Sequence, residues 1–297
     1  METLGFIGLG KIGLPIAKSL IASGYPVIGY RRHAMQEFVD AGGDAGHSPA
    51  DVTARADIVL SCLPSEDALD EVVEGPNGII HAARPGQVVV ELGSHAVPRK
   101  QRHVDVLARK GAIFIDGEVS GTPGMVQRRK GAVYLAGDEA ACARLEPVMR
   151  GFLDTVLYLG AFGAASRVKL LNNLLVAIHI AATAEAMALG LRAGIEPDKL
   201  IHAIVNGSGF SAQFGARAPR MAAGQFLPAE GDPIGLSHYF GLIDAFAGEL
   251  GLDTPLLDRA KELFQRAIDE GLGEHDNAIL VELATKPFTG GRARSGR

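Results

Sequence analysis

The segment "GFIGLGKIGLPIAKSL", residues 5–20, decides the fold, because Gly8, Gly10 and Gly13 fall at the spacing G-x-G-x-x-G. An apolar, strand-like run precedes these glycines and a helical apolar pattern follows them. In such a strand-turn-helix unit, the first glycine permits a tight turn, the second admits a pyrophosphate, and the third allows close helix packing. The pyrophosphate then meets the positive end of the helix. We therefore predict a dinucleotide-binding turn, whereas the alternative is a flexible turn before an ordinary helix. The predicted contacts are Gly8, Leu9, Gly10, Lys11, Ile12 and Gly13.

The end of the second predicted strand indicates which dinucleotide binds. A site for NAD(H) usually places an acidic residue about 20 residues after the motif, on the ribose hydroxyls. This chain has Arg31 and Arg32 in that region. A carboxylate would repel a 2′-phosphate, whereas a guanidinium can donate two hydrogen bonds to it. We therefore expect NADP(H) to be preferred over NAD(H); the alternative is a solvated basic strand end.

The chain divides into two parts. Up to about residue 160, β-rich runs alternate with helical segments, which predicts an α/β fold with a doubly wound parallel sheet. The predicted strands are "TLGFIG", "PVIGY", "DIVLSCL", "QVVVEL", "AIFID" and "AVYLAG". A long helix from Ala164 past Leu189 then opens an all-α part. We expect a dinucleotide-binding domain over residues 1–162, an all-α domain over 163–290 and a disordered tail over 291–297.

Composition excludes several classes of protein. The 297-residue chain has a formal net charge of -5, which argues against nucleic acid as a partner. Cys62 and Cys142 fit neither a zinc site nor a disulfide scaffold, so we expect a reducing cytoplasm and no metal. The N-terminus lacks the basic region of a signal sequence. The uncharged stretch from Leu170 to Ala184 reads as too short and too polar to span a bilayer, so no membrane partner is expected.

The long helix carries a lysine among apolar residues. Lys169 and Asn173 are four residues apart and therefore share one face. A buried lysine whose pKa falls can exchange protons near neutral pH, which an alcohol dehydrogenase without a metal requires. In the other reading, which this segment supports equally, Lys169 extends its charge into solvent beside Arg167.

The stretch "IDGEVSGTPG" places Ser120 and Gly121 just after a predicted strand. A hydroxyl and free backbone N–H groups at the carboxyl end of a sheet can bind a substrate carboxylate. The alternative is an ordinary turn, because Ser, Gly, Thr and Pro are common turn residues.

Over nearly all of its length the chain resembles the β-hydroxyacid dehydrogenase family. The segments that carry the resemblance are "GFIGLGKIGLPIAKSL", "DGEVSG", "GAFGAASRVKLLNN" and "GLGEHD". The resemblance implies a Rossmann domain followed by a helical domain, assembled as a homodimer or homotetramer. It also implies that Lys169 is the general acid/base, that Asn173 holds the substrate and that Ser120 with Gly121 contacts the substrate carboxylate. Ser94 is expected beside the nicotinamide, with Leu63 and Pro64 as further cofactor contacts.

The chain departs from the family pattern at three places. Thr122 stands where the family usually has glycine, and the following loop, "PGMVQRRKG", is longer and basic. That loop either attracts an anionic substrate group or is a solvated basic turn. Gly93 stands where a serine is common. His238 aligns with the first residue of the family's usual Lys-Asp pair, so His238 either keeps a weaker, pH-dependent substrate contact or marks a less acidic substrate.

These features together predict an enzyme. We expect hydride transfer between NADP(H) and a small, anionic hydroxy acid or its aldehyde or keto counterpart, with Lys169 as the acid/base. An imine reductase on the same scaffold is one alternative, although that group typically replaces the lysine. A non-catalytic NADP(H)-binding protein is the other alternative.

Overall fold

The computed structural model describes residues 1–286, which form two compact units, and the first of them, Met1–Lys169, is built on one eight-stranded sheet. The strands are β1 (Leu4–Ile7), β2 (Val27–Tyr30), β3 (Asp44–Ala45), β4 (Ile58–Ser61), β5 (Val88–Glu91), β6 (Ile113–Ser120), β7 (Ala132–Ala136) and β8 (Thr155–Tyr158). The helices are α1 (Gly13–Ala22), α2 (Gln36–Asp40), α3 (Pro49–Arg55), α4 (Glu66–Glu74), α5 (Val97–Ala108), α6 (Pro123–Gln127) and α7 (Glu139–Met149), with the 3-10 helix η1 (Ile79–His81).

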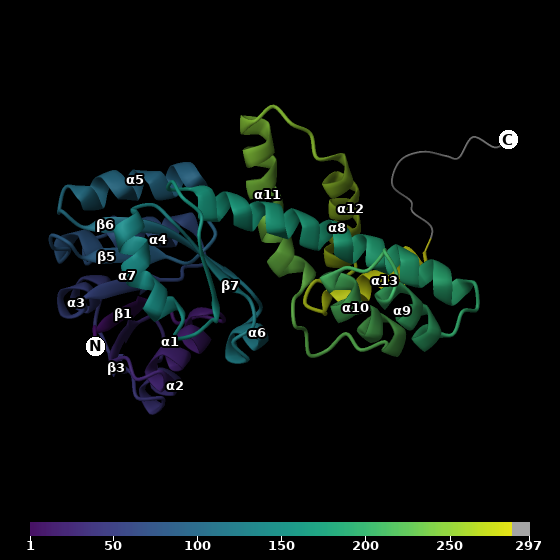
Figure 1. The fold of residues 1–297 in the computed structure, drawn as a ribbon, viewed down its shortest axis with the longest axis horizontal. Helices are drawn as coiled ribbons and strands as arrows, with labels where there is room; N and C mark the ends of the chain where they lie inside the picture. The colour runs from purple at the N-terminus through teal and green to yellow at the C-terminus, as the bar shows by residue number, and fades with distance from the viewer. Residues whose placement is uncertain (287–297) are drawn as a thin grey trace. The chain divides into compact units, whose positions relative to one another are not determined.

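The sheet order is β3-β2-β1-β4-β5-β6-β7-β8 (Figure 1). The chain leaves β1 toward β2 on one side and returns to β4 on the other. β1 is therefore the strand at which the direction of winding reverses, where open α/β sheets bind their ligands beyond the carboxyl ends of the strands. The predicted α/β class is confirmed, and the glycine turn lies at this edge because it directly follows β1.

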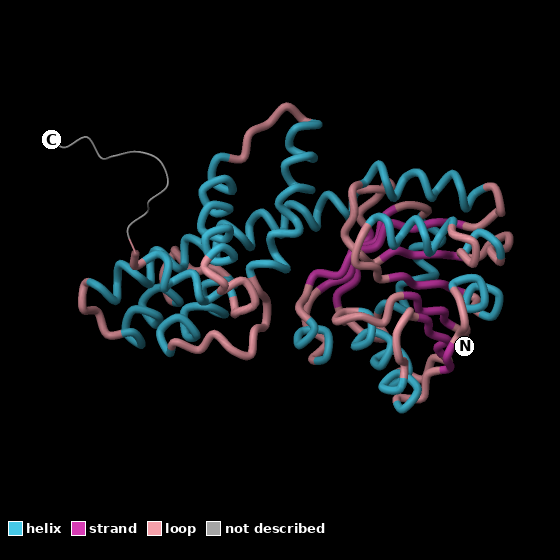
Figure 2. The backbone as a smooth tube through the Cα atoms, turned by 180° about the vertical axis from the view of Figure 1, so that it is seen from behind, coloured by secondary structure: helices cyan, strands magenta, loops and turns pink. Residues whose placement is uncertain are grey.

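Helices cover both faces of the sheet (Figure 2). Alternate residues of each strand point to opposite faces. Phe6 of β1 joins the apolar cluster under α1 and α7, whereas Ile7 joins the cluster under α3, α4 and α5. The strands consequently read as continuous apolar runs, which is the pattern expected for a parallel sheet buried on both sides.

The sheet departs from the prediction in three respects. β7 runs antiparallel to β6, so the expectation of an entirely parallel sheet is wrong at this pair. The connection between β6 and β7 holds only the short helix α6, and parallel strands need a longer crossover. β6 also continues to Ser120, past the predicted end of the strand. Two short strands, β3 and β8, were not predicted.

The second unit begins at Leu170 and is helical. Its helices are α8 (Ala164–Arg192, which starts in the first unit), α9 (Pro197–Val205), α10 (Ala212–Ala223), α11 (Pro233–Glu249), α12 (Pro255–Asp269) and α13 (Leu280–Ala284), with the 3-10 helix η2 (Asn277–Ile279). One face of α8, including Ala177, Ile180 and Ala184, forms the core with Phe214 and Phe264. The predicted domain boundary after residue 162 stays a prediction, and the predicted tail over 291–297 lies outside the described residues.

The long helix α8 is also apolar enough, by length and composition, to cross a membrane. The expectation concerned only the stretch from Leu170 to Ala184, and α8 extends beyond that stretch at both ends. The buried face of α8 nevertheless forms part of the core of the helical unit. A helix that is buried in a protein core is also long and apolar, as a membrane-spanning helix is.

A buried ion pair supports the helical unit at "GLGEHD". Arg217 of α10 donates to Asp276 at 2.6 Å (Nη1 to Oδ2), and both side chains are buried. Asp276 also accepts hydrogen bonds from the backbone N–H groups of Glu230 and Ala278, each at 2.9 Å. This carboxylate therefore joins α10, the loop before α11 and η2.

Replacing Asp276 by alanine should destabilise the helical unit by about 3–5 kcal/mol, because Arg217 would remain buried without its counter-charge. Chemical denaturation followed by circular dichroism would measure the loss. Asp269→Ala, at an exposed position on α12, is the matched control and should change stability by less than about 0.5 kcal/mol. Equal effects of the two substitutions would contradict this role of Asp276.

Candidate active site

The glycine turn between β1 and α1 has three different spatial requirements. Gly8 has a φ of 100°, and a Cβ there would lie 2.3 Å from the carbonyl oxygen of Cys62. A Cβ on Gly13 would lie 2.0 Å from the carbonyl oxygen of Gly8. A Cβ on Gly10, in contrast, would have no atom of the described chain within 4 Å, so this side of the turn is open. Two glycines thus serve the fold, and the third leaves space for a ligand.

The start of α1 directly follows this turn, and the N–H of Leu14 donates to the carbonyl oxygen of Gly10 at 3.0 Å. The N-cap residue of α1 is Ile12, and in the described chain no side chain caps this end. The first N–H groups of a helix attract anions when they are left unpaired. The residues present therefore fit a dinucleotide pyrophosphate. Of the other predicted contacts, Lys11 is exposed, whereas the Leu9 side chain is buried in the core, so only the backbone of Leu9 can face a ligand.

The two arginines after β2 have different surroundings. Arg31 donates to the carbonyl oxygens of Leu9, at 2.9 Å, and Ala34, at 2.6 Å, and so fastens the end of β2 to the glycine turn. Arg32 is exposed. Arg31 therefore stabilises the turn, whereas the side chain of Arg32 is open to solvent.

The loops after β4 and β5 lie together over a buried carboxylate. Glu91 accepts hydrogen bonds from the backbone N–H groups of Gly93, at 2.7 Å, and Leu63, at 3.3 Å. A Cβ on residue 93 would lie 2.5 Å from Oε1 of Glu91 and 2.9 Å from the carbonyl oxygen of Leu63, so the space at this position favours glycine over serine. The predicted cofactor residues Leu63 and Ser94 thus lie on neighbouring loops. Pro64, the residue after Leu63, is exposed.

Beneath these loops lies a group of buried charges that the sequence did not predict. The ammonium of Lys100 on α5 contacts Asp116 at 3.0 Å and Glu118 at 3.2 Å, and all three side chains are essentially inaccessible to solvent. Burial opposes the ammonium form, but the carboxylates of Asp116, Glu118 and Glu91 keep the pKa of Lys100 above its ordinary value. The signal for this cluster was the pair of carboxylates two residues apart in "DGEV", on one face of a buried strand.

Two serines connect this cluster to its surroundings. Ser94 donates to Glu118 at 2.5 Å. Ser166, in the first turn of α8, donates its hydroxyl to Asp116 at 2.6 Å and its backbone N–H to the same carboxylate at 3.0 Å. The cluster therefore fixes where α8 begins relative to β6.

Lys169 lies one turn beyond Ser166 on the same face of α8 and is only 6% exposed. The reading in which this lysine extends into solvent is wrong, although its neighbour Arg167 is exposed. Burial lowers the pKa of Lys169 below the ordinary lysine value, and the charge of Glu118 partly offsets that effect. A buried amine with a lowered pKa is what a proton-transfer role requires.

The remaining predicted substrate residues lie in both units. Asn173 is buried on α8, four residues beyond Lys169, and accepts a hydrogen bond from the side chain of Asn172 at 3.3 Å. Ser120 ends β6, and Gly121 follows it. Thr122 caps α6 by accepting the N–H of Met125 at 3.3 Å, so its hydroxyl serves the fold. His238 is exposed on α11, with its ring edge-on to Tyr239.

The basic segment after α6 is held in place. Arg129 has a φ of 57° and donates to Asp154 at 2.8 Å and to the carbonyl oxygen of Gly151 at 2.9 Å. Arg128, Arg129 and Lys130 are exposed, which agrees with a solvated basic turn, and the guanidinium of Arg129 also connects α6 to the segment before β8. The attraction of an anionic substrate group stays a prediction.

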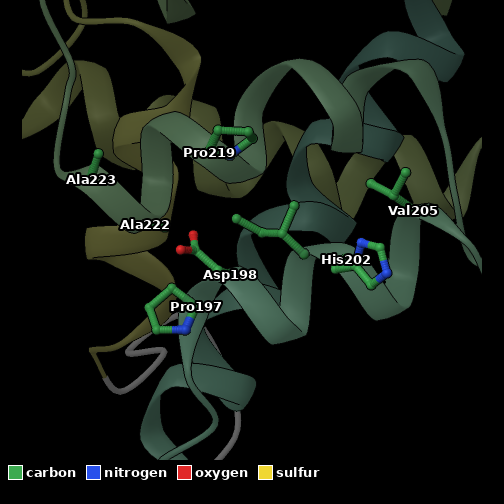
Figure 3. A pocket seen from close by; sticks show the side chains of 8 residues that line it. Pro197, Asp198, His202, Val205, Pro219, Ala222 and Ala223 are labelled. Atoms are coloured by element: carbon green, nitrogen blue, oxygen red, sulfur yellow. The ribbon is translucent and has the colours of Figure 1, made fainter.

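Two further places resemble binding sites: a pocket in the helical unit and a group of residues of metal-binding type. A pocket of about 570 Å³ lies between α9 and α10, with Asp198, His202 and Pro219 among its lining residues (Figure 3), and none of the predicted site residues lines it. Asp70, Glu74 and His103 gather at spacings that a metal could bridge. Two guanidinium groups, of Arg99 and Arg102, already pair with these carboxylates, which disfavours a cation there.

Comparison with known proteins agrees with this geometry. Residues 3–160 match the model of the NAD binding domain of 6-phosphogluconate dehydrogenase. Residues 163–284 match the model described as the NAD-binding domain of NADP-dependent 3-hydroxyisobutyrate dehydrogenase.

Individual relatives match over almost the whole chain. L-threonate dehydrogenase of Cupriavidus necator is 33% identical over 295 residues, covering 95% of this chain and 96% of that enzyme. The crystal structure of 3-hydroxyisobutyrate dehydrogenase from Salmonella typhimurium is 26% identical, with a TM-score of 0.82 and coverage of 95% and 99%. An imine reductase variant from Myxococcus stipitatus, in complex with NAD+, shares the fold at 20% identity, with a TM-score of 0.63 and coverage of 95% and 98%.

The different surroundings of Gly10 and Gly13 lead to opposite expectations for two alanine variants. Gly10→Ala should keep the Tm of the protein, because its Cβ meets no described atom, but weaken nicotinamide dinucleotide binding roughly tenfold or more. Gly13→Ala should lower the Tm, because its Cβ collides with the backbone of Gly8. Thermal unfolding and fluorescence titration with the cofactor would measure both. A Gly10→Ala protein that binds the cofactor normally would rule out the assigned position of the pyrophosphate.

Proposed function

Because this chain belongs to the β-hydroxyacid dehydrogenase family and is thus an NAD(P)-dependent oxidoreductase acting on CH–OH groups, we propose that it interconverts a small, anionic hydroxy acid and its aldehyde or keto counterpart with NADP(H). The observation that carries the proposal is Lys169. This buried amine combines a lowered pKa with a fixed position on α8, one turn beyond the serine that is anchored to β6.

In the proposed mechanism Lys169 moves the proton. The bound nicotinamide supplies or accepts the hydride. In oxidation, neutral Lys169 takes the proton of the substrate hydroxyl at Nζ, and in reduction its ammonium returns the proton to the carbonyl oxygen. A lysine with the ordinary pKa of about 10.4 would be a poor base near neutral pH, so burial serves the reaction.

We assign binding of the substrate to groups near the end of β6 and on α8. The hydroxyl of Ser120 and the N–H of Gly121 are suited to a carboxylate, since both follow the buried part of β6. Asn173 shares the helix face of Lys169 and can orient either that amine or the substrate oxygen. His238 is proposed to tune specificity, with a weaker and pH-dependent attraction for anions than a lysine would provide.

An imine reductase remains the second candidate function. The shared fold and the absence of the usual Lys-Asp pair at His238 and Tyr239 favour it. The presence of Lys169 favours the hydroxy acid reaction, because imine reductases typically replace that residue.

Lys169→Met should reduce turnover by roughly 10²–10⁴-fold while leaving cofactor binding intact, since it removes the acid/base but keeps an apolar side chain of similar length. The assay follows nicotinamide absorbance with a panel of hydroxy acids, semialdehydes and cyclic imines. In wild type, the oxidation rate should fall as the pH decreases through the pKa of Lys169, because the ammonium cannot accept a proton. Arg167→Met, at the exposed neighbouring position, is the control and should retain turnover. Near-full activity in Lys169→Met would exclude the role, and turnover of imines alone would favour the second candidate.

The cofactor proposal separates the two arginines. Arg32→Asp should weaken NADPH binding about tenfold or more, because it removes a charge-assisted contact, and should change NADH binding little. Arg31→Ala should weaken the binding of both cofactors and lower the Tm, because Arg31 fastens the glycine turn. Fluorescence titration of each variant with NADPH and NADH measures the preference. A wild-type protein that binds NADH at least as tightly as NADPH would refute the proposed preference.

A further inference from the structure

We propose that Glu118 is a positioning residue that acts through Lys169, with its carboxylate serving as the counter-charge of the Lys169 ammonium. The inference rests on the proposed acid/base role of Lys169 and extends it to a residue on a different element. The matches with known proteins assign no role to Glu118.

The first argument is the balance of buried charge. Asp116 and Glu118 project from the same face of β6, and both are essentially inaccessible to solvent. Lys100 lies within ion-pair distance of both, so one ammonium serves two carboxylates. A buried charge without compensation is strongly unfavourable. The excess negative charge is offset either by a proton on a carboxyl or by a second cation, and Lys169 is a second buried lysine on which Glu118 acts electrostatically.

The second argument is the way in which Glu118 is bonded. Its Oε2 accepts the hydroxyl of Ser94 at 2.5 Å, and its Oε1 lies 3.2 Å from both the ammonium of Lys100 and the hydroxyl of Ser166. An ionised carboxylate is an acceptor only, and the donors Ser94 and Lys100 match that form, whereas the single hydroxyl proton of Ser166 is directed to Asp116 at the shorter distance. Burial raises the pKa of Glu118 above its ordinary value, whereas the ammonium groups of Lys100 and Lys169 and the hydroxyl of Ser94 favour the charged form. The carboxylate is held at a fixed place, between the loop that bears Ser94 and the first turn of α8.

The third argument is the geometry of α8. Ser166 and Lys169 are three residues apart, so their side chains lie on the same face of the helix, one turn from each other. Ser166 contacts Glu118 directly, which places Lys169 next along that face. Asp116, in contrast, is bonded to both the backbone and the hydroxyl of Ser166 at the helix start. We therefore assign the two carboxylates different roles: Asp116 fixes the start of the helix, and Glu118 acts on the charge of Lys169.

The titratable groups around this pair come from three elements and from the segment after β4, where burial and the charges of Glu91 and Glu118 raise the pKa of the Cys62 thiol. Lys100 approaches Glu118 from α5, Asp116 lies beside it on β6, and Glu91 on β5 contributes to the field at Lys100. Burial lowers the pKa of Lys169, while Glu118 raises it. Removing the charge of Glu118 should therefore make Lys169 lose its proton at lower pH. Removing Asp116 should act mainly on the start of α8.

The test compares Glu118→Gln with Asp116→Asn in the full chain. Each substitution removes one carboxylate charge from β6 and nearly preserves shape. The protonation of Lys169 is followed by NMR with lysine labelled at the ε carbon, and Lys169→Met identifies the resonance. Glu118→Gln should lower the titration midpoint of Lys169 by about one pH unit. Asp116→Asn should move the midpoint less and lower the Tm more.

The pH dependence of turnover provides the second readout. In Glu118→Gln, the loss of oxidation rate on acidification should occur at lower pH, and the loss of reduction rate on raising the pH should also begin earlier. Equal Lys169 midpoints in wild type and Glu118→Gln would overturn the inference, whatever the effect on stability. Because the NMR titration does not need turnover, it decides the role of Glu118 even if no substrate reacts and the proposed function fails.

Discussion

The buried ion cluster of Lys100, Asp116 and Glu118 is the constraint on which the candidate site depends. It joins α5 to β6, and through Ser166 it joins β6 to the start of α8. Such a cluster is stable only if every charge has a partner and every partner is correctly placed. The same requirement that holds the cluster together therefore fixes the helix that carries Lys169. The stability of the cluster and the position of Lys169 therefore have a common physical cause.

The glycine turn at the predicted cofactor site depends on a different constraint, which is the lack of space for a Cβ atom at particular positions. Gly8 and Gly13 are required because neighbouring backbone atoms leave no room for a Cβ, whereas Gly10 borders open space. Gly93 belongs to the first kind, since Oε1 of Glu91 occupies the space that a side chain would need. A buried carboxylate thus determines the residue type in a loop, and a departure from the family pattern has a local steric explanation.

Much of the first unit could be predicted from sequence because its signals are local. A glycine motif between an apolar run and a helical pattern depends only on neighbouring residues, and the long helix α8 was predicted for the same reason. β3 has two residues, and β8 is largely exposed, so neither has a strong apolar pattern. Lys100 was missed because "PRKQRH" resembles a solvated helix surface. Its burial depends on partners 16 to 66 residues away, which no local pattern contains. Arg31 and Arg32 were likewise equivalent in sequence and differ only through the carbonyl oxygens that Arg31 reaches.

The protonation of Lys169 reflects two opposing contributions that arise from the same packing. Burial removes water from the amine and favours the neutral form, whereas Glu118, buried with it, favours the ammonium. A reversible dehydrogenase needs both forms, since oxidation consumes the neutral amine and reduction consumes the ammonium. Desolvation alone would leave a base with little tendency to keep a proton, and a fully compensated ion pair would leave an acid with little tendency to release one. A lysine held at the edge of a carboxylate cluster, rather than at its centre like Lys100, lies between these limits.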